Sequence, residues 1–397
     1  MNAADFTTAQ RQFLRPLPGG ILAFHPPPAP DDIPLSSSLV NALAVANHAL
    51  GELDGTGRHL PNPHLLIGPY LRREAVLSSR IEGTQSGLGD ILMVEASGIR
   101  NPDPDTREVI NYVSALERGI AELPTLPVSL RLVRGLHGRL MDGVRGADRT
   151  PGEFRRYQNY VGPKGAPIEE ATFVPPPAGP VLEAALDDWE RFLHRDDDIP
   201  LLVRCAWMHY QFETIHPFAD GNGRVGRLLI PLLLIERKVL SQPLLYVSAL
   251  LERERDAYYD SLMRGRLTGD LTPWLALFLR AVETQARDAS RRADRLAWLQ
   301  ESYHQRFARS RSAVLRPLID MLFSRLVVSV PALARELSVS EPSAQAAVNA
   351  LVSADILRES TGKKRGRVYV AAEVFASIMP EEVPPSASSI PAPTLGA

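Results

Sequence analysis

The spacing of hydrophobic residues along the chain predicts a mainly helical protein. Over most of the 397 residues, apolar side chains recur every three or four positions, which places them on one face of an amphipathic helix. One stretch, 227–240, is apolar on nearly every side, which predicts a helix buried in the core. The predicted helical segments are 35–53, 64–82 (with Pro61 and Pro63 before its start and Gly83 after its end), 105–123, 127–141, 180–194, 200–214, 227–240, 253–266 and 272–307.

Two regions depart from this helical pattern. Residues 150–177 alternate apolar and polar positions around the sequence GPKG, and the alternation predicts a β-hairpin. From Arg311 onward the pattern indicates a helix, a short turn, a second helix and a basic hairpin, which predicts a winged helix-turn-helix domain over 310–375. Proline-rich composition predicts an extended arm over 1–35, and a Pro/Ser/Ala-rich tail predicts disorder over 380–397.

The composition narrows the class of protein. Lys and Arg number 44 while Asp and Glu number 46, so a net charge of -2 favours no general attraction to nucleic acid or acidic lipid. The single cysteine, Cys205, excludes a disulfide within the chain and lies in an apolar stretch, which predicts a buried thiol. The longest apolar run, 228–235, is far shorter than the roughly 18 residues of a membrane helix. We therefore expect a cytoplasmic protein with no membrane partner.

The stretch HPFADGNGRVGR, residues 216–227, combines residue types that a regular element does not need. A helix starting near Arg224 would add the N–H groups and the positive dipole of its first turn to an anion site. Arg224 and Arg227, three positions apart, would add fixed positive charge for phosphate oxygens. Three successive residues tolerate positive φ angles, so that their N–H groups can converge on an anion: Gly221, Asn222 and Gly223.

Two side chains in the same stretch suit the transfer of a phosphate-containing group to a hydroxyl. Asp220 adjoins the predicted anion site, and a lone carboxylate beside phosphates commonly holds Mg²⁺. His216, with an ordinary pKa of about 6.5, can accept a proton at neutral pH. Two other histidines, His209 and His137, are expected to be packed in helices rather than to act as bases.

These twelve residues resemble the motif of the Fic (filamentation-induced-by-cAMP) family, H-x-F-x-[D/E]-G-N-G-R-x-x-R, at every specified position. The phrases HYQFETIHPF and NYVSALERGI also resemble bacterial Fic proteins that carry an N-terminal helical region and a C-terminal winged helix. The resemblance implies a helical Fic-type core over 105–300 with a β-hairpin flap. It also implies an N-terminal helical region over 36–104 that includes an inhibitory helix.

The same resemblance implies protein adenylylation, in which AMP moves from ATP to a Ser, Thr or Tyr hydroxyl of a target protein and pyrophosphate leaves. His216 would be the general base, and Asp220 would hold Mg²⁺ bridging the α- and β-phosphates. Asn222 and the neighbouring N–H groups would bind the phosphates. Phe218 would pack into the core and hold the loop in place.

The stretch SSRIEG resembles the family's inhibitory helix, [S/T]-x-x-x-E-[G/N], in the version placed N-terminal to the catalytic motif. Ser78 and Glu82 are four positions apart and share a helix face, and Gly83 is placed to end the helix. The resemblance implies an ion pair between Glu82 and Arg227, which would otherwise grip the γ-phosphate, so that ATP is held out of line. For Arg80 we expect only a solvated charge.

Residues outside the motif complete the expected site. The hairpin 152–175 resembles the family's flap, which can pair with an extended segment of the target protein by strand addition. Tyr258 and Tyr259 resemble a tyrosine pair that lines the adenine pocket in relatives, although both could equally be packing residues of one helix. Arg266 stands where some relatives have asparagine, which puts adenine specificity in doubt.

The sequence does not decide what the predicted winged helix binds. Its wing carries four cations suited to a phosphate backbone, whereas its recognition helix has no Lys or Arg and offers only Ser343, Gln345 and Asn349 as readers. DNA binding, and a role in homodimer contact or target choice, are therefore both kept as expectations. The wing cations are Lys363, Lys364, Arg365 and Arg367.

Three other functions stand beside autoinhibited adenylylation. The first is a nucleotide-sensing, DNA-binding regulator with a non-catalytic Fic-like domain; intact His216 and Asp220 favour the enzyme, because a sensor needs no base. The second is transfer of the γ-phosphate from a reversed nucleotide, which the GNG sequence and both arginines disfavour. The third is removal of AMP from a modified target, with Glu82 positioning water.

Overall fold

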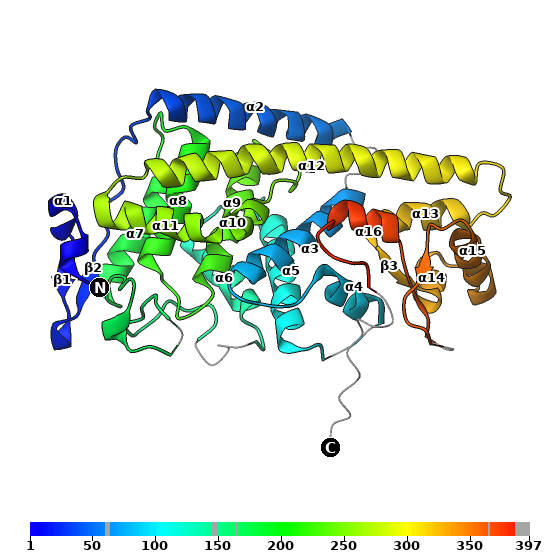
Figure 1. The fold of residues 1–397 in the computed structure, drawn as a ribbon, viewed down its shortest axis with the longest axis horizontal. Coiled ribbons are helices and arrows are strands. Elements are labelled where there is room, and N and C mark those ends of the chain that lie inside the picture. The colour runs from blue at the N-terminus through cyan, green and yellow to red at the C-terminus, as the bar shows by residue number, and fades with distance from the viewer. Residues whose placement is uncertain are drawn as a thin grey trace, which may run out of the picture. The chain divides into compact units, whose positions relative to one another are not determined.

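The fold is mainly helical, as the sequence predicts (Figure 1). A computed structural model describes residues 1–59, 64–97, 99, 101–144, 150–163, 165–363 and 366–385. The chain forms two compact units, the first containing residues 1–52 and 111–287 and the second residues 53–110 and 288–397. Three long helices contribute residues to both units: α2 (Ser37–His59), α5 (Pro104–Glu122) and α12 (Thr272–Arg306).

The first unit is built around α8 (Leu201–Ile215), whose residues from 202 to 215 are all buried. Because such a helix must be covered on every side, α7 (Pro180–His194) and α9 (Asn222–Glu236) pack against it. The indole N–H groups of Trp189 and Trp274 donate to α8 carbonyls at 2.9 and 2.8 Å. Further helices of this unit are α6 (Leu130–Leu140), α10 (Ser248–Arg253) and α11 (Arg255–Thr268).

The N-terminal residues fold onto the first unit, so the prediction of an extended arm is wrong for this part of the chain. A helical turn, α1 (Thr8–Arg11), precedes an antiparallel pair of strands, β1 (Leu14–Pro16) and β2 (Leu22–Phe24). A short 3₁₀ turn, η1 (Ala3–Asp5), precedes α1, and another, η2 (Pro18–Gly20), connects the two strands. The physical reason is a small apolar cluster in which Phe6, Leu14 and Phe24 bury themselves against Phe173.

The segment predicted as a hairpin contains no regular pair of strands in its described residues. A single antiparallel bridge joins Val161 and Phe173, with hydrogen bonds of 2.8 and 3.0 Å between their backbones. A 3₁₀ turn, η3 (Ile168–Glu170), interrupts the return strand. Proline lacks the N–H that a strand ladder needs, and this segment carries several prolines, which limits the pairing. Residues 152–175 are called the flap segment below.

The second unit combines the predicted inhibitory helix with the C-terminal elements. Helix α3 (His64–Ile81) packs against α13 (Leu315–Ser324) and α16 (Ala372–Ile378), and α4 (Leu88–Ser97) packs against β3 (Val327–Ser329). The sheet order is β3-β5-β4, and all pairs are antiparallel. The other elements are α14 (Val330–Glu336), α15 (Glu341–Ser353), β4 (Arg358–Glu359) and β5 (Val368–Val370).

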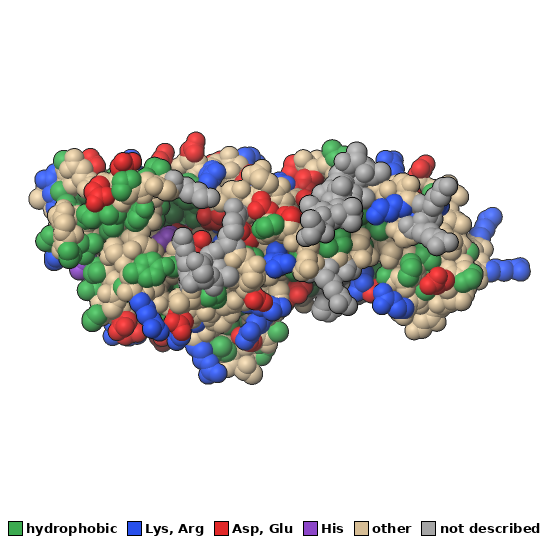
Figure 2. Space-filling view, turned by 90° about the horizontal axis from the view of Figure 1, so that it is seen from below, with side chains coloured by type: hydrophobic (Ala, Val, Ile, Leu, Met, Phe, Trp, Pro, Cys, Tyr) green, Lys and Arg blue, Asp and Glu red, His purple; other side chains and the backbone are tan. Residues whose placement is uncertain are grey.

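The order of these C-terminal elements agrees with the predicted sequence of helices and basic hairpin, while the winged-helix assignment and its partner stay predictions. Two of the four wing cations, Lys364 and Arg365, lie outside the described residues. On the face shown in Figure 2, basic and acidic side chains are interspersed. No helix within the described ranges is both long enough and apolar enough to span a membrane.

Candidate active site

His216 ends helix α8 in a left-handed conformation. Its φ and ψ are 49° and 60°, and its N–H donates to the carbonyl of Phe212 at 2.9 Å. A non-glycine residue pays about 1 kcal/mol for this conformation, so the surrounding contacts must hold it. The turn leaves the side chain 19% exposed, with Nδ1 buried and 3.8 Å from a carboxylate oxygen of Glu213.

Two side chains from the flap segment hold the backbone of that turn. Arg155 Nε donates to the His216 carbonyl at 2.9 Å, and Nη2 donates to Ile215 at 3.3 Å. Asn159 Nδ2 donates to the carbonyls of His216 and Phe218 at 3.3 and 2.9 Å. Burial lowers the pKa of Arg155 to about 10, which still leaves it charged at neutral pH. The sequence indicates no role for either residue, because both act through contacts distant in the chain.

Phe218 packs into the core, as predicted. Its ring stacks on that of His137, with centroids 3.7 Å apart and planes within 4°. The Asn222 amide closes the loop below the ring, because Oδ1 accepts from the Phe218 N–H at 2.8 Å and Nδ2 donates to the Phe218 carbonyl at 2.9 Å. The Asn222 side chain therefore shapes the loop, and its backbone N–H is the group left to face an anion.

His137 is a packed histidine with a defined tautomer. The Gly152 N–H donates to Nδ1 at 2.9 Å, so Nδ1 carries no proton, and Nε2 donates to the Asp220 carbonyl at 3.1 Å. Burial lowers the pKa of His137 to about 4, which keeps the ring neutral. His137 thus joins the backbone at the start of the flap segment to the backbone of the motif.

The start of α9 lies where the sequence predicts an anion site, but its backbone differs from the prediction. Gly221 has a positive φ of 77°, but Asn222 and Gly223 already lie in the first turn of α9, so the prediction of three successive positive φ angles is wrong. Hydrogen bonding within a helix starting at Asn222 requires negative φ. The N–H groups of that first turn have no carbonyl partner within the helix, which is the arrangement that binds anions.

Asp220 presents a carboxylate beside the first turn of α9. Its Oδ1 accepts from the Gly221 N–H at 2.6 Å and lies 3.8 Å from Nη2 of Arg224, and the side chain is 45% exposed. Among the described residues, no group of three or more His, Cys, Asp or Glu could hold a metal ion. Mg²⁺ at nucleotide sites commonly uses one or two carboxylates and completes its shell with phosphates and water, so a single exposed carboxylate fits that cation.

Both motif arginines are buried. Arg224 and Arg227 lie on α9, and Arg224 Nη2 contacts Met141 Sδ at 3.8 Å. Beside them, Gly226 allows α8 and α9 to approach closely, because a Cβ at this position would lie 3.1 Å from His209 Nδ1 and 3.3 Å from Glu213 Oε1. The positive charge of the two arginines suits the predicted phosphate site.

The chain matches two family models. Residues 40–121 match the family model described as Fic/DOC family N-terminal, and residues 127–234 match that of the Fic/DOC family. The chain is a Fic family protein. It is 38% identical over 178 residues to a probable protein adenylyltransferase of Aquifex aeolicus, a match covering 41% of this chain and 51% of the relative.

Other relatives share smaller parts. The chain is 28% identical over 152 residues to the protein adenylyltransferase Fic of Drosophila melanogaster, a match that covers 38% of this chain and 27% of the relative. The chain thus spans about half or less of the length of these curated relatives. The crystal structure of a Fic family protein from Desulfovibrio desulfuricans has the same fold, with a TM-score of 0.55, 20% identity, and coverage of 86% of this chain and 98% of that one.

Around the Fic motif, the two tyrosines of α11 differ in exposure. Tyr258 is 1% exposed, and its hydroxyl shares a 2.8 Å hydrogen bond with His209 Nε2, so in this conformation a base could not stack on it. Tyr259 is 37% exposed, with the Arg255 guanidinium 5.7 Å from its ring centre. An adenine-binding role is left to Tyr259 and stays a prediction there, while Tyr258 and His209 are packing residues.

In this Fic protein, Arg266 contacts the carboxyl end of α8. Its Nη2 donates to the Glu213 carbonyl at 3.0 Å and its Nε to Thr214 Oγ1 at 3.2 Å, and the guanidinium lies 4.2 Å from the Phe173 ring centre. A cation at the carboxyl end of a helix is stabilised by the helix dipole. Cys205, also on α8, is buried, which confirms the prediction. Burial raises the pKa of its thiol.

The predicted inhibitory sequence lies at the end of α3 in the second unit. Ser78 is buried and Glu82 is exposed, and Gly83 ends the helix with a φ of 94° and an N–H that donates to the Arg80 carbonyl at 2.9 Å. Arg80 forms an ion pair with Glu382, so the expectation of a merely solvated charge is wrong. Since Arg227 belongs to the first unit, its pairing with Glu82 stays a prediction.

Proposed function

We propose that this Fic family protein is a protein adenylyltransferase that moves AMP from ATP to a Ser, Thr or Tyr hydroxyl of a target protein. The observation that carries the proposal is the joint geometry of the motif. A histidine on a strained turn, an exposed carboxylate and the first turn of a buried helix meet within twelve residues. The names of the Aquifex and Drosophila relatives support the same activity.

In the proposed reaction, the target hydroxyl attacks the α-phosphorus of ATP. The new O–P bond forms as the bond to the β-phosphate oxygen breaks, and pyrophosphate leaves. His216 accepts the hydroxyl proton, and Nε2 is the nitrogen assigned to this step because Nδ1 is buried toward Glu213. The N–H groups at the start of α9 bind phosphate oxygens. Asp220 would hold Mg²⁺, which neutralises phosphate charge when it is bound.

We further propose that Glu82 restrains this transfer in the resting protein. The residue is exposed at the end of α3, next to a glycine that closes the helix. By resemblance to Fic inhibitory helices, its partner is Arg227, whose guanidinium would otherwise receive the γ-phosphate. The flap segment is the proposed docking edge for the target protein.

Radiolabelled ATP tests the activity. The full chain carrying Glu82→Gly, incubated with Mg²⁺ and a cell lysate, should transfer label from α-labelled ATP beyond that seen with the lysate alone. It should add nothing to the labelling that the kinases of the lysate give with γ-labelled ATP. The unchanged chain should transfer less. If the chain adds label from the γ position alone, the reaction is phosphoryl transfer and not adenylylation. Equal labelling by the two chains would show that Glu82 does not restrain the transfer.

A further inference from the structure

The C-terminal residues of the second unit bind both ends of the loop that carries Glu82. Residues 380–385 are called the C-terminal clasp, and residues 82–87 the inhibitory loop. The Glu382 carboxylate pairs with the Arg80 guanidinium at the end of α3, and its Oε2 accepts from the Leu88 N–H at 2.9 Å at the start of α4. One carboxylate therefore bridges the two helix ends between which the inhibitory loop runs.

Two glycines at the start of α4 leave room for the clasp. A Cβ at Gly87 would lie 2.9 Å from Glu382 Oε2, and a Cβ at Gly89 would lie 3.2 Å from Pro385 Cγ. A side chain at Gly87 would displace the end of the Glu382 side chain, and one at Gly89 would press on the Pro385 ring. The sequence Gly-Leu-Gly at the start of α4 therefore leaves space for Glu382 and Pro385, which lie against it.

Contacts with three other residues hold the C-terminal clasp and the residues just before it in place. Ser360 Oγ donates to the Pro385 carbonyl at 2.8 Å, beside the three-stranded sheet. Arg73 Nη2 lies 3.6 Å from Glu381 Oε1. Arg292 Nη1 donates to the carbonyls of Ser377 and Ile378 at 2.8 and 3.2 Å, which fixes the end of α16 just before the clasp.

The inhibitory loop has a second support from the start of α5. The Gln85 N–H donates to Asp105 at 2.8 Å, and the hydroxyls of Ser86 and Thr106 lie 2.9 Å apart. Glu382 differs from these partners because it contacts both helix ends rather than the loop interior. Loss of Glu382 should therefore change how the helix ends present the loop while α5 still holds its middle.

We propose that Glu382, acting through Arg80 and the Leu88 N–H, is a positioning residue that holds the inhibitory loop in the conformation from which Glu82 restrains transfer. The proposal rests on the proposed function and deepens it, because it makes the C-terminal clasp part of the restraint. Arg80 thereby gains a role that its sequence position did not indicate. Displacement of the clasp would release the transferase without any change in the Fic motif.

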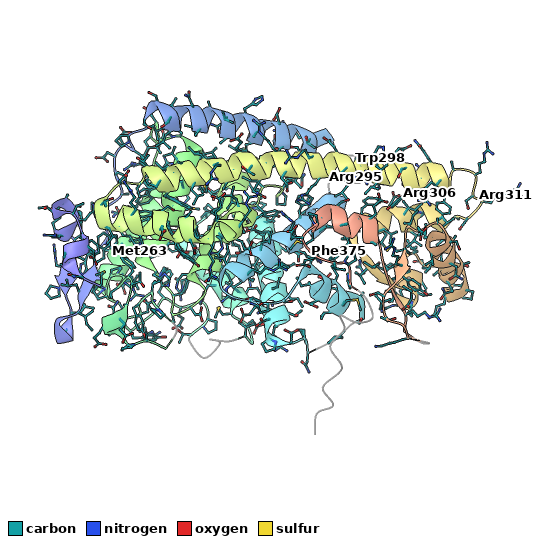
Figure 3. The ribbon with its side chains drawn as sticks, viewed as in Figure 1. Met263, Arg295, Trp298, Arg306, Arg311 and Phe375 are labelled. Atoms are coloured by element: carbon teal, nitrogen blue, oxygen red, sulfur yellow. The ribbon has the colours of Figure 1, made fainter. Side chains whose placement is uncertain are left out.

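The test compares variants of the full chain by label from α-labelled ATP. Glu382→Ala removes both contacts and should raise labelling about fivefold, since a contact worth about 1 kcal/mol changes an equilibrium by that factor. Glu382→Gln keeps an acceptor for Leu88 and should raise it less. The matched control is Glu373→Gln, which breaks an ion pair of α16 with Arg295 on α12, a residue marked in Figure 3, and should change nothing.

Two further measurements make the outcome decisive. In a Glu82→Gly background, Glu382→Ala should give no additional labelling, because the restraint is already gone. Hydrogen exchange at amides 84–88 should accelerate in Glu382→Ala, while amides of α13 stay protected. An additive increase in the Glu82→Gly background, or unchanged exchange at 84–88, would overturn the proposal. If Glu82→Gly itself transfers no label, the proposed function fails, and the exchange result still decides whether the clasp holds the loop.

Discussion

Replacement of Arg155 by methionine should damage the site without touching the Fic motif. Its guanidinium donates to four carbonyls: His216 at 2.9 Å, Ile215 at 3.3 Å, Pro176 at 2.5 Å and Tyr157 at 3.3 Å. Only two of these hydrogen bonds are short, and a charged hydrogen bond contributes about 1.5 kcal/mol. We therefore expect Arg155→Met to lower the free energy of unfolding by about 3 kcal/mol.

Activity should fall together with stability, for a separate reason. The His216 carbonyl loses the closer of its two donors and keeps Asn159 at 3.3 Å, and misplacement of a catalytic group by about 1 Å costs about 100-fold in rate. In a Glu82→Gly background, kcat for label transfer should drop while KM for ATP stays within about threefold, because phosphate binding belongs to the start of α9.

The matched control is Arg156→Met. Arg156 is the next residue, is largely exposed and pairs with Glu153 at 2.9 Å on the surface. This substitution should leave both labelling and the unfolding midpoint unchanged. Thermal unfolding measures the stability of the two variants, and steady-state kinetics measures their kcat and KM. If Arg155→Met kept the wild-type kcat at a temperature where it is folded, the flap segment would not be what positions His216.

Three other predictions concern neighbouring contacts. Gly226→Ala should destabilise the protein by about 1–3 kcal/mol, as overpacking does, because its Cβ would lie 3.1 Å from His209; a midpoint equal to that of the unchanged protein would contradict the close approach. Tyr258→Phe should lower stability by about 1 kcal/mol and leave the KM for ATP unchanged; a raised KM would restore Tyr258 to the adenine pocket. The pKa of His137 falls from 6.5 to about 4 on folding, so the unfolded chain binds more protons between these values. Stability should therefore be lost as pH falls from 6.5 toward 4, and His137→Gln should show a shallower loss in denaturant titrations; equal slopes would contradict the buried neutral ring.

The sequence predicted those parts of the fold that local pattern determines. Helical periodicity located α8 and α9, and the twelve-residue motif located His216 and Asp220 at their junction. The first residues were misjudged because prolines dominate their composition, while Phe6 and Phe24 find their apolar partner, Phe173, about 150 residues away.

Other features depend on contacts that no local pattern contains. Arg155 holds the backbone of His216, which lies 61 residues along the chain, and nothing in its immediate neighbours distinguishes it from Arg156. Arg80 and Glu382 are separated by 302 residues, so the charge at position 80 could be interpreted only as solvated. The flap segment has the alternation of a hairpin, but its prolines remove the donors that a ladder requires.

The most direct test of the account is His216→Ala in the Glu82→Gly chain, measured for label transfer from α-labelled ATP and for ATP binding by calorimetry. If the imidazole removes the proton from the target hydroxyl, transfer should be abolished while ATP binding remains within about threefold of the parent. Transfer that continues at the parent rate would show that His216 is not the base.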